Sequence, residues 1–540
     1  MRTSLARALA CAGLAMIVTA CTTAPPEVDT SPREEPSPSP TTPPFEPVLA
    51  PRLLAEMDLD DKIGQLLVLT AQGTTAAENA ALIETHRPGG LIYFDANLTD
   101  AAQIAELSNG VQELSPVPLF LGIDQEQGLV VRLPVGTRFP DAMAVGATRD
   151  SDLAALRATT TAIELAALGI NLNYAPDADV NTDPNNPVIG IRSFGSEPDL
   201  VAEMAVAESA AYADQGIVPV VKHFPGHGDT DVDSHTGLPV IDLPRDTWEA
   251  EHLPPFRAAV DAGVDAVMTA HVLMPQLDPD EPATLSSTII GGILRDELGY
   301  EGVITTDALN MEGVRQRHSD GENAVLALEA GVDQLLMPPD PTAAVAAVKE
   351  AVETGRLTEE RIDQSVLRVL ALKEERGVLE ADPVDPAAAE EILTDPAHAD
   401  AAQRVADASV TLLRNTDDLL PLPPGTRVRV EGTNADRLGP ALTDAGLDVV
   451  TGDADAVIVG TDTAPVHRSS APTIAVSQGG PYVLGSSDTD AFVAVYSSVD
   501  VSLAAAARVI AGRIEPTGTL PVGIPETDAT FGTGLTFEKD

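Results

Sequence analysis

The chain has 540 residues, of which 83 are acidic and 32 are basic, so its formal net charge is −51. A surface this acidic repels nucleic acid and anionic membranes. It therefore excludes a protein that binds either of them through a basic surface of its own. Hydrophobic residues make up 44% of the chain, enough for globular packing, and the length predicts two domains rather than one.

The first segment, residues 1–21, has the pattern of an export signal. Arg2 and Arg7 precede an apolar stretch that is shorter than the ~20 residues of a membrane span. The stretch ends in Val-Thr-Ala-Cys at Cys21, which resembles a bacterial lipobox and implies cleavage before Cys21 and its acylation. The alternative is an ordinary signal peptide with an incidental cysteine. The only other cysteine, Cys11, lies in the removed part, so we expect no disulfide and no cysteine metal site.

A proline-rich segment follows. Residues 22–51 contain ten prolines among serine, threonine and glutamate, which is typical of an extended, disordered tether. A lipid anchor with such a tether predicts an exported protein of the cell envelope, held at the outer face of the cytoplasmic membrane.

Residues 52–376 alternate short apolar runs with helical patterns such as 152–168 and 198–215. Each run is mostly apolar, as a parallel strand that is buried on both faces requires. The runs begin at Ile63, Gly89, Val117, Ile170, Ile217, Val264, Glu301 and Val332. Eight such units predict an α/β fold, a (β/α)8 barrel of the TIM type. An open doubly wound sheet is the alternative, but no glycine-rich phosphate motif follows an early strand.

Polar side chains close several of these runs. They are Asp124, Lys222, His223, His271 and Asp307. Because a barrel builds its active site at the carboxyl ends of its strands, this placement predicts a shared site.

The pattern changes after residue 376. Residues 377–400 are expected to form a linker, and residues 401–540 a smaller α/β sandwich domain, in which apolar runs such as "DAVIVGT" and "AFVAVYSS" alternate with loops. No cluster of titratable groups stands out in this domain. We expect it to be structural or to cover one rim of the barrel.

The segment 222–239, "KHFPGHGDTDVDSHTGLP", holds three of the nine histidines. Asp233 and His235 are two residues apart, so on a turn the carboxylate can orient the imidazole and stabilise its protonated form. A histidine with a pKa of ~6.5 exchanges protons readily near neutral pH. At the end of the seventh run, Asp307 can attack an electrophilic carbon or act as a base, and retaining glycosidases combine such a nucleophile with a proton donor.

Zinc is the alternative reading of this loop, with His223, His227 and His235 as ligands. It is disfavoured because there is no HExxH pair on a helix, and because glycines 226 and 228 indicate a loop that opens and closes. We therefore expect no metal and no other cofactor.

The motifs "KHFPGHGDTDVDSH" and "ITTDALNM" resemble the signatures of glycoside hydrolase family 3, in its β-N-acetylhexosaminidase branch. Further similar stretches follow in family order from Met57 onward: "LDDKIGQLLVL", "LGIDQEQG", "NPVIGIRSFG", "VMTAHV", "ASVTLLRN" and "IEPTGTLPV". The resemblance implies a barrel followed by an α/β sandwich, and retention of configuration through a glycosyl-aspartate.

Carried onto this chain, the resemblance implies that Asp307 is the nucleophile and that His235, held by Asp233, is the general acid/base. It also implies a set of residues that hold the sugar in the first subsite: Asp124, Arg132, Arg192, Lys222 and His223. We add His227 and His271 as predicted substrate contacts. One departure stands out, because the family commonly has Gly-Gly-Arg where this chain has Gln127, Gly128 and Leu129.

These features predict a lipoprotein that is a retaining exo-β-N-acetylglucosaminidase. It would act as a monomer on carbohydrate, on peptidoglycan fragments or chitooligosaccharides. The alternatives within the family are a β-glucosidase, which usually takes its acid from the second domain, and a phosphorylase that uses phosphate in place of water. A non-catalytic wall-binding lipoprotein is the alternative of another class, and the intact Asp307, Asp233 and His235 disfavour it.

Overall fold

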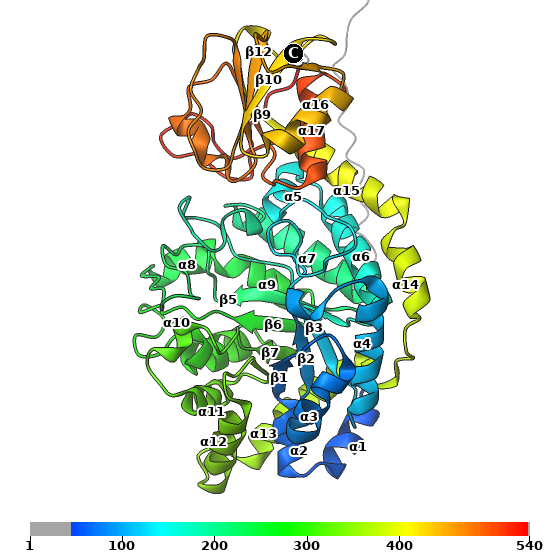
Figure 1. The fold of residues 1–540 in the computed structure, drawn as a ribbon. Coiled ribbons are helices and arrows are strands. Elements are labelled where there is room, and N and C mark those ends of the chain that lie inside the picture. Colours follow the sequence, from blue (N-terminus) through cyan, green and yellow to red (C-terminus); the bar gives the residue numbers. More distant parts are fainter. Residues whose placement is uncertain (1–44, 538–540) are drawn as a thin grey trace, which may run out of the picture. The chain divides into compact units, whose positions relative to one another are not determined.

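The computed structural model describes residues 45–537, and within them the part up to Glu375 forms a barrel (Figure 1). Its strands are β1 (Leu67–Thr70), β2 (Gly90–Tyr93), β3 (Phe120–Ile123), β4 (Leu172–Asn173), β5 (Val218–Phe224), β6 (Ala266–Thr269), β7 (Val303–Thr305) and β8 (Leu335–Leu336). All neighbours are parallel, in the order β7-β6-β5-β4-β3-β2-β1-β8. A parallel bridge between Thr305 and Gln334 joins the two ends of this order. The predicted (β/α)8 barrel is confirmed, and the open doubly wound sheet is excluded.

Helices surround the strands. They are α1 (Leu49–Glu56), α2 (Leu59–Gln65), α3 (Ala76–His86), α4 (Ala101–Leu114), α5 (Ala142–Thr148), α6 (Ser151–Ala167), α7 (Pro198–Asp214), α8 (Arg245–Glu251), α9 (Leu253–Asp261), the π-helix η4 (Thr288–Glu297), α10 (Glu312–Arg315), α11 (Asp320–Ala330), α12 (Pro341–Glu353) and α13 (Glu359–Glu375). The first apolar run, expected as a strand from Ile63, is divided between α2 and β1. The reason is local: Asp58 caps α2 by accepting a hydrogen bond from the Asp61 N–H, which fixes a helix over the beginning of the run.

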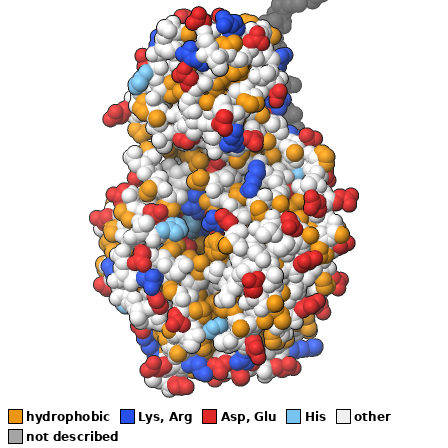
Figure 2. Space-filling model, in the orientation of Figure 1, with side chains coloured by type: hydrophobic (Ala, Val, Ile, Leu, Met, Phe, Trp, Pro, Cys, Tyr) orange, Lys and Arg blue, Asp and Glu red, His pale blue; other side chains and the backbone are white. Residues whose placement is uncertain are grey.

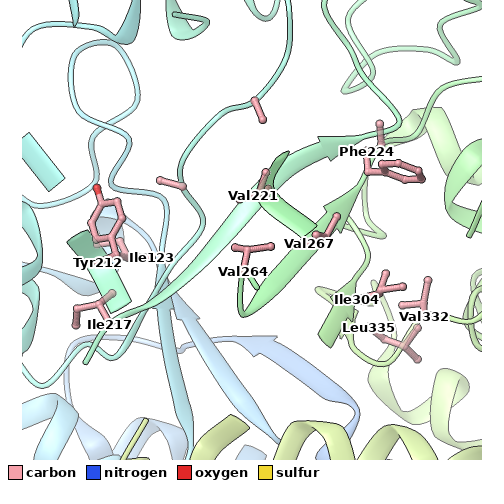
Figure 3. Packing of buried hydrophobic residues seen from close by; sticks show 14 of the residues in the cluster. Ile123, Tyr212, Ile217, Val221, Phe224, Val264, Val267, Ile304, Val332 and Leu335 are labelled. Atoms are coloured by element: carbon pink, nitrogen blue, oxygen red, sulfur yellow. The ribbon is translucent and has the colours of Figure 1, made fainter. Parts of the chain in front are cut away.

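The strands bury both faces, as their apolar runs require. Val218 and Val220 of β5 point into the barrel interior, whose floor is completed by Val369 and Leu372 of α13. The next side chain along β5, Val221, packs on the outside between strands and helices, in the layer that Figure 3 shows. This alternation follows from the period of two in a β-strand, and it leaves the carboxyl ends of the strands free to carry polar groups.

The second domain is a six-stranded sheet in the order β11-β10-β12-β13-β14-β9, in which β9 alone is antiparallel to its neighbour. Its strands are β9 (Thr411–Asn415), β10 (Arg427–Gly432), β11 (Asp448–Val449), β12 (Ala456–Thr461), β13 (Thr473–Ser477) and β14 (Ala491–Ala494). One face packs against α16 (Ala435–Asp444) and α17 (Asp500–Ile510). The other face buries Phe492 against Met143 of α5 and Leu520. The predicted α/β sandwich is thus present.

The segment expected to be a linker, residues 377–400, is mostly helical. It contains α14 (Pro386–Leu393) and the beginning of α15 (Pro396–Ser409). Ala389 and Leu393 of α14 are buried in the core of the barrel. Apolar side chains at helical spacing therefore attach this segment to the barrel.

Residues 1–44 lie outside the described residues, and with them Cys21, the expected signal peptide and most of the expected tether. The tether was expected to reach residue 51, but α1 begins at Leu49, so this boundary is corrected. The Glu374 carboxylate accepts hydrogen bonds from the N–H groups of Val48, Leu49 and Ala50, which satisfies the first turn of the helix. Over residues 45–537, no helix has both the length and the apolar character needed to cross a membrane.

Candidate active site

A cavity of about 390 Å³ lies at the carboxyl ends of the barrel strands, within the size range of small-molecule sites. Eight of the ten predicted catalytic and binding residues line it: Asp124, Arg132, Arg192, Lys222, His223, His227, His235 and Asp307. On the face drawn in Figure 2, basic and histidine side chains gather in a hollow of a surface whose other charged groups are largely acidic. Asp233 and His271 do not line the cavity.

Asp307 follows β7, and the backbone N–H of the next residue holds its side chain. Its Oδ1 accepts a hydrogen bond of 2.7 Å from the Ala308 N–H. Burial raises the pKa of this carboxyl, but the nearby His271, His223 and Lys222 and the Ala308 N–H outweigh burial, so the pKa lies below its ordinary value. Asp307 is therefore an ionised carboxylate at neutral pH, as a nucleophile requires.

A chain of ion pairs forms one wall of the cavity. Lys222 Nζ lies 3.0 Å from Asp124 Oδ1 and 2.5 Å from Glu126 Oε1. Glu126 also accepts two hydrogen bonds from the Arg192 guanidinium, of 2.9 and 2.8 Å. Burial raises the pKa of Glu126, but Arg192 and Lys222 more than reverse this and hold the pKa well below its ordinary value. These contacts fix the side chains of Lys222 and Arg192 in the cavity wall.

Glu126 was not among the residues predicted from the sequence. It belongs to the quoted stretch "LGIDQEQG", two positions after Asp124. This closeness to a predicted site residue is the sequence feature that could have pointed to Glu126. Its two cationic partners lie far away in the chain and could not be paired with it from spacing alone.

Asp179 is a second residue that the sequence did not reveal. Its Oδ2 lies 2.7 Å from His223 Nδ1, and its Oδ1 accepts a 2.6 Å hydrogen bond from the His227 N–H. Burial raises the pKa of Asp179, but His223 and His227 outweigh it, and the pKa falls below the ordinary value. One buried carboxylate therefore fixes both the first and the last residue of the turn 223–227.

Asp177 lies beside this pair and has the opposite character. Burial and the nearby Asp179 charge raise its pKa well above the ordinary value. Oxygen and nitrogen atoms of Asp177, Asp179 and His223 lie within 4.8 Å of one another, the one such group of possible metal ligands over residues 45–537. A hydrogen bond joins His223 to Asp179, and Asp177 Oδ2 lies 3.9 Å from His223 Nδ1 and 3.6 Å from the Arg192 guanidinium.

The structure does not assemble the zinc alternative from the three histidines of the loop. His227 uses both ring nitrogens in hydrogen bonds of 3.0 Å, with Thr230 Oγ1 at Nδ1 and with Ser234 Oγ at Nε2. Burial lowers the pKa of His227 to about 4, so the ring is neutral near pH 7. His227 is thus placed to shape the loop, since its Nε2 holds the residue between Asp233 and His235.

Asp233 and His235 form the predicted pair. Asp233 Oδ1 lies 2.7 Å from His235 Nδ1 and also accepts a 2.9 Å hydrogen bond from the His235 N–H. Burial raises the pKa of Asp233, but these two hydrogen bonds outweigh it and lower the pKa below its ordinary value. The His235 side chain is 63% exposed, and the residue lines the cavity. With Nδ1 held by the carboxylate, Nε2 is the ring atom left to exchange a proton with a ligand.

His271 was predicted to contact substrate, and the structure places it elsewhere. The residue is fully buried, and its Nε2 lies 3.0 Å from the carbonyl oxygen of Ala308. Its Nδ1 lies 2.8 Å from Thr284 Oγ1. The strand-end pattern located His271 correctly, just beyond the end of β6, but could not show that its side chain turns toward the backbone behind Asp307. We therefore reassign it as a support for the Asp307–Ala308 peptide.

The segment after Asp307 packs against the loop of Asp233 and His235. The Gly313 N–H donates a 3.0 Å hydrogen bond to the carbonyl oxygen of Ser234. A Cβ atom at position 313 would lie 2.9 Å from that oxygen and 3.1 Å from the carbonyl oxygen of Gly237. Only glycine fits here, and this contact joins the two loops that carry the predicted catalytic residues.

The C-terminal domain contributes no lining residue to this cavity among the described residues. It contacts a neighbouring loop, where the Asn181 side-chain amide donates a 2.9 Å hydrogen bond to the Tyr482 hydroxyl. Further along that loop, the Asn186 amide donates to the carbonyl oxygen of His227, and Val188 and Ile189 line the cavity. The domain thus supports one rim from behind.

Comparisons with known proteins assign the family. The model of the glycosyl hydrolase family 3 N-terminal domain matches residues 58–372, more than half of the chain. The chain belongs to this family. "Beta-hexosaminidase A" of Pseudoalteromonas piscicida is 37% identical over 383 residues, which are 65% of this chain and 63% of that relative's length.

Two further similar proteins have names that state an activity. A "Beta-N-acetylglucosaminidase/beta-glucosidase" of Cellulomonas fimi is 29% identical over 379 residues, covering 68% of this chain and 67% of the relative. The solved structure of a family 3 beta-N-acetylglucosaminidase from Paenibacillus sp. str. FPU-7 superposes with a TM-score of 0.81 at 37% identity, covering 87% of this chain and all of that one. The family resemblance read from the motifs is confirmed.

The contact at Gly313 yields a test of how the two loops are coupled. We expect Gly313→Ala to displace Ser234 and with it His235, and to lower kcat on a β-N-acetylglucosaminyl disaccharide by up to about 100-fold, because small misplacements of catalytic groups are costly. Thermal unfolding should change little. Gly523→Ala is the matched control, since position 523 is exposed and a Cβ there meets nothing within 4 Å. Equal activity of the two variants would show that the contact does not position the loop.

Proposed function

We propose that the protein is a retaining exo-β-N-acetylglucosaminidase that works through a covalent glycosyl-aspartate. The observation that carries this proposal is that an ionised carboxylate, Asp307, and a carboxylate-bound imidazole, His235, line the same cavity. Retaining glycosidases need such a nucleophile and such a proton donor on either side of the scissile bond.

The first step forms the glycosyl-enzyme. Asp307 attacks the anomeric carbon, and the bond from that carbon to the aglycone oxygen breaks. His235, protonated at Nε2, gives its proton to the departing oxygen, so that the aglycone leaves as a neutral alcohol. Asp233 stabilises the charged imidazole before the transfer, and it keeps the ring oriented by its bond to Nδ1.

The second step releases the sugar. His235, now neutral, removes a proton from a water molecule, and the resulting oxygen attacks the anomeric carbon. The bond to Asp307 breaks, the carboxylate is restored, and His235 is again protonated. Two inversions give overall retention of the β configuration. Exposure of the His235 side chain is consistent with a loop that admits water at this stage.

The shape of the site supports a terminal sugar as substrate. Side chains from the ends of six strands surround the cavity, which closes below on Ile92, Met268 and Leu336 from the barrel interior. The paired Lys222, Asp124 and Arg192 on its wall offer fixed donors and acceptors to sugar hydroxyls. N-acetylglucosamine is the proposed sugar, by similarity to the named relatives, and peptidoglycan fragments and chitooligosaccharides are the proposed sources.

A β-glucosidase activity is the second candidate, because the Cellulomonas fimi relative carries both activities in its name. The two are separated by comparing kcat/KM on aryl β-N-acetylglucosaminides and aryl β-glucosides that have the same aglycone. A phosphorylase is separated from a hydrolase by looking for sugar 1-phosphate when phosphate is added.

The proposed nucleophile can be tested by trapping. We expect Asp307→Ala to lose nearly all activity, because the other carboxylates of the cavity, Asp124 and Glu126, are held in ion pairs with Lys222 and Arg192, while its thermal unfolding stays close to wild type. A 2-acetamido-2-deoxy-5-fluoro glycoside should label the peptide that contains Asp307, as read by mass spectrometry. Label on a different carboxylate would contradict the assignment.

We also propose that the protein is anchored by lipid at Cys21, on the lipobox-like sequence that ends there. Wild-type activity should sediment with the membrane fraction, and Cys21→Ser should shift it to the soluble fraction with unchanged kcat. Recovery of the wild-type protein only as a soluble secreted species would rule the anchor out.

A further inference from the structure

Apolar side chains are exposed on two loops at the mouth of the cavity. Leu129 is 70% exposed at the tip of a tight turn, which the pairing of Gln127 with Val130 closes. Val130 itself lines the cavity. From the other loop, Val232 is 37% exposed directly before the proposed acid/base pair. Large exposed apolar side chains are few among residues 45–537, so their presence on both loops points to a contact surface.

The turn that carries Leu129 is built rigidly. The Leu129 N–H donates a 2.7 Å hydrogen bond to Asp141 Oδ1, and the Gly128 N–H donates to the carbonyl oxygen of Phe139. Gln127 and Gly128 adopt positive φ angles of 72° and 62°, as a tight turn requires. Leu129 is therefore presented to solvent by a fixed backbone.

The cavity that these two loops border is itself partly apolar, since Phe94, Met311 and Met337 are part of its lining. We define the apolar rim as Leu129, Val130, Val232 and these three side chains. A sugar or aryl group with an apolar face would bury area against it.

The charges of the lining balance. Lys222 and Arg192 are paired with Asp124 and Glu126. Arg132, whose guanidinium lies 5.4 Å from the Phe94 ring centroid, and Asp307 add one positive and one negative charge to the lining. The proposed His235 imidazolium is paired with Asp233, so these groups together carry no surplus of positive charge, and the chain as a whole carries a charge of −51.

We propose that the apolar rim selects an uncharged aglycone with an apolar face and disfavours one that carries a carboxylate. This inference rests on the proposed function and narrows its substrate class, from peptidoglycan fragments or chitooligosaccharides toward neutral oligosaccharides and glycosides. The physical reason is twofold: a carboxylate placed against apolar side chains loses hydration without gaining a partner, and the acidic protein repels it at long range.

The test compares two aryl β-N-acetylglucosaminides of equal size, with 4-hydroxybenzamide and 4-hydroxybenzoate as aglycones. We expect kcat/KM to favour the amide by about tenfold at low salt, the ratio that 1.4 kcal/mol produces. The preference should shrink in high salt, because the long-range part of the repulsion is screened.

Leu129→Arg supplies the missing positive charge at the rim. We expect it to raise kcat/KM for the benzoate relative to the amide by about tenfold, a ratio that again corresponds to about 1.4 kcal/mol. Leu114→Arg is the matched control, since Leu114 is 42% exposed at the end of α4, next to the amino end of β3 and away from the cavity. It should leave the ratio of the two substrates as in the wild type.

The outcomes separate the inference from the proposed function. Equal turnover of both glycosides, or a preference for the benzoate, would overturn the inference alone and point to Arg132 as a carboxylate site. A ratio that neither salt nor Leu129→Arg changes would also overturn it. If neither glycoside is turned over and Asp307 is not labelled by the fluoro sugar, the proposed function fails and the inference fails with it.

Discussion

The buried carboxylate of Asp179 is the interaction on which the arrangement of this site depends. It accepts hydrogen bonds from the His223 ring and from the His227 N–H, and so fixes the turn between them. From there the connection continues outward: His227 Nε2 holds Ser234, and the Ser234 carbonyl accepts the Gly313 N–H. A short chain of hydrogen bonds thus runs from the segment after β4 to the loop of the proposed acid/base pair and on to the segment that follows the proposed nucleophile.

The second organising constraint is electrostatic. A chain with a net charge of −51 must still offer a sugar fixed donors as well as acceptors. It does so by burying Lys222 and Arg192 against Glu126. Buried charges are costly unless they are paired, and pairing here also removes the freedom of the two long side chains. The same balance leaves no net positive charge in the cavity, which is why the character of the rim decides what is accepted beyond the first sugar.

Much of this fold and site could be predicted from the sequence. Apolar runs of strand length, alternating with helical patterns, gave the barrel, and the polar residues that close these runs gave most of the cavity lining, because parallel strands bring their carboxyl ends to one face. Asp179, Glu126 and Gly313 could not be found in this way. Their roles depend on partners far apart in the chain, and nothing in the local pattern distinguishes them from loop residues. His271 shows a different limit of prediction: its place just beyond the end of β6 was predicted correctly, but the sequence could not show the direction of its side chain.

The central claim is that His235, held by Asp233, donates and removes the proton, and kinetics of His235→Ala test it most directly. The variant should lose hydrolysis of unactivated disaccharides severely, yet form the glycosyl-enzyme from a 2,4-dinitrophenyl glycoside at a much less reduced rate, since that aglycone departs without a proton. Azide, which needs no deprotonation, should then restore turnover and give a β-glycosyl azide. Asp231→Ala, on the same loop but outside the pair, should behave as wild type. Equal losses on good and poor leaving groups, with no azide product, would contradict the account and return His235 to a structural role.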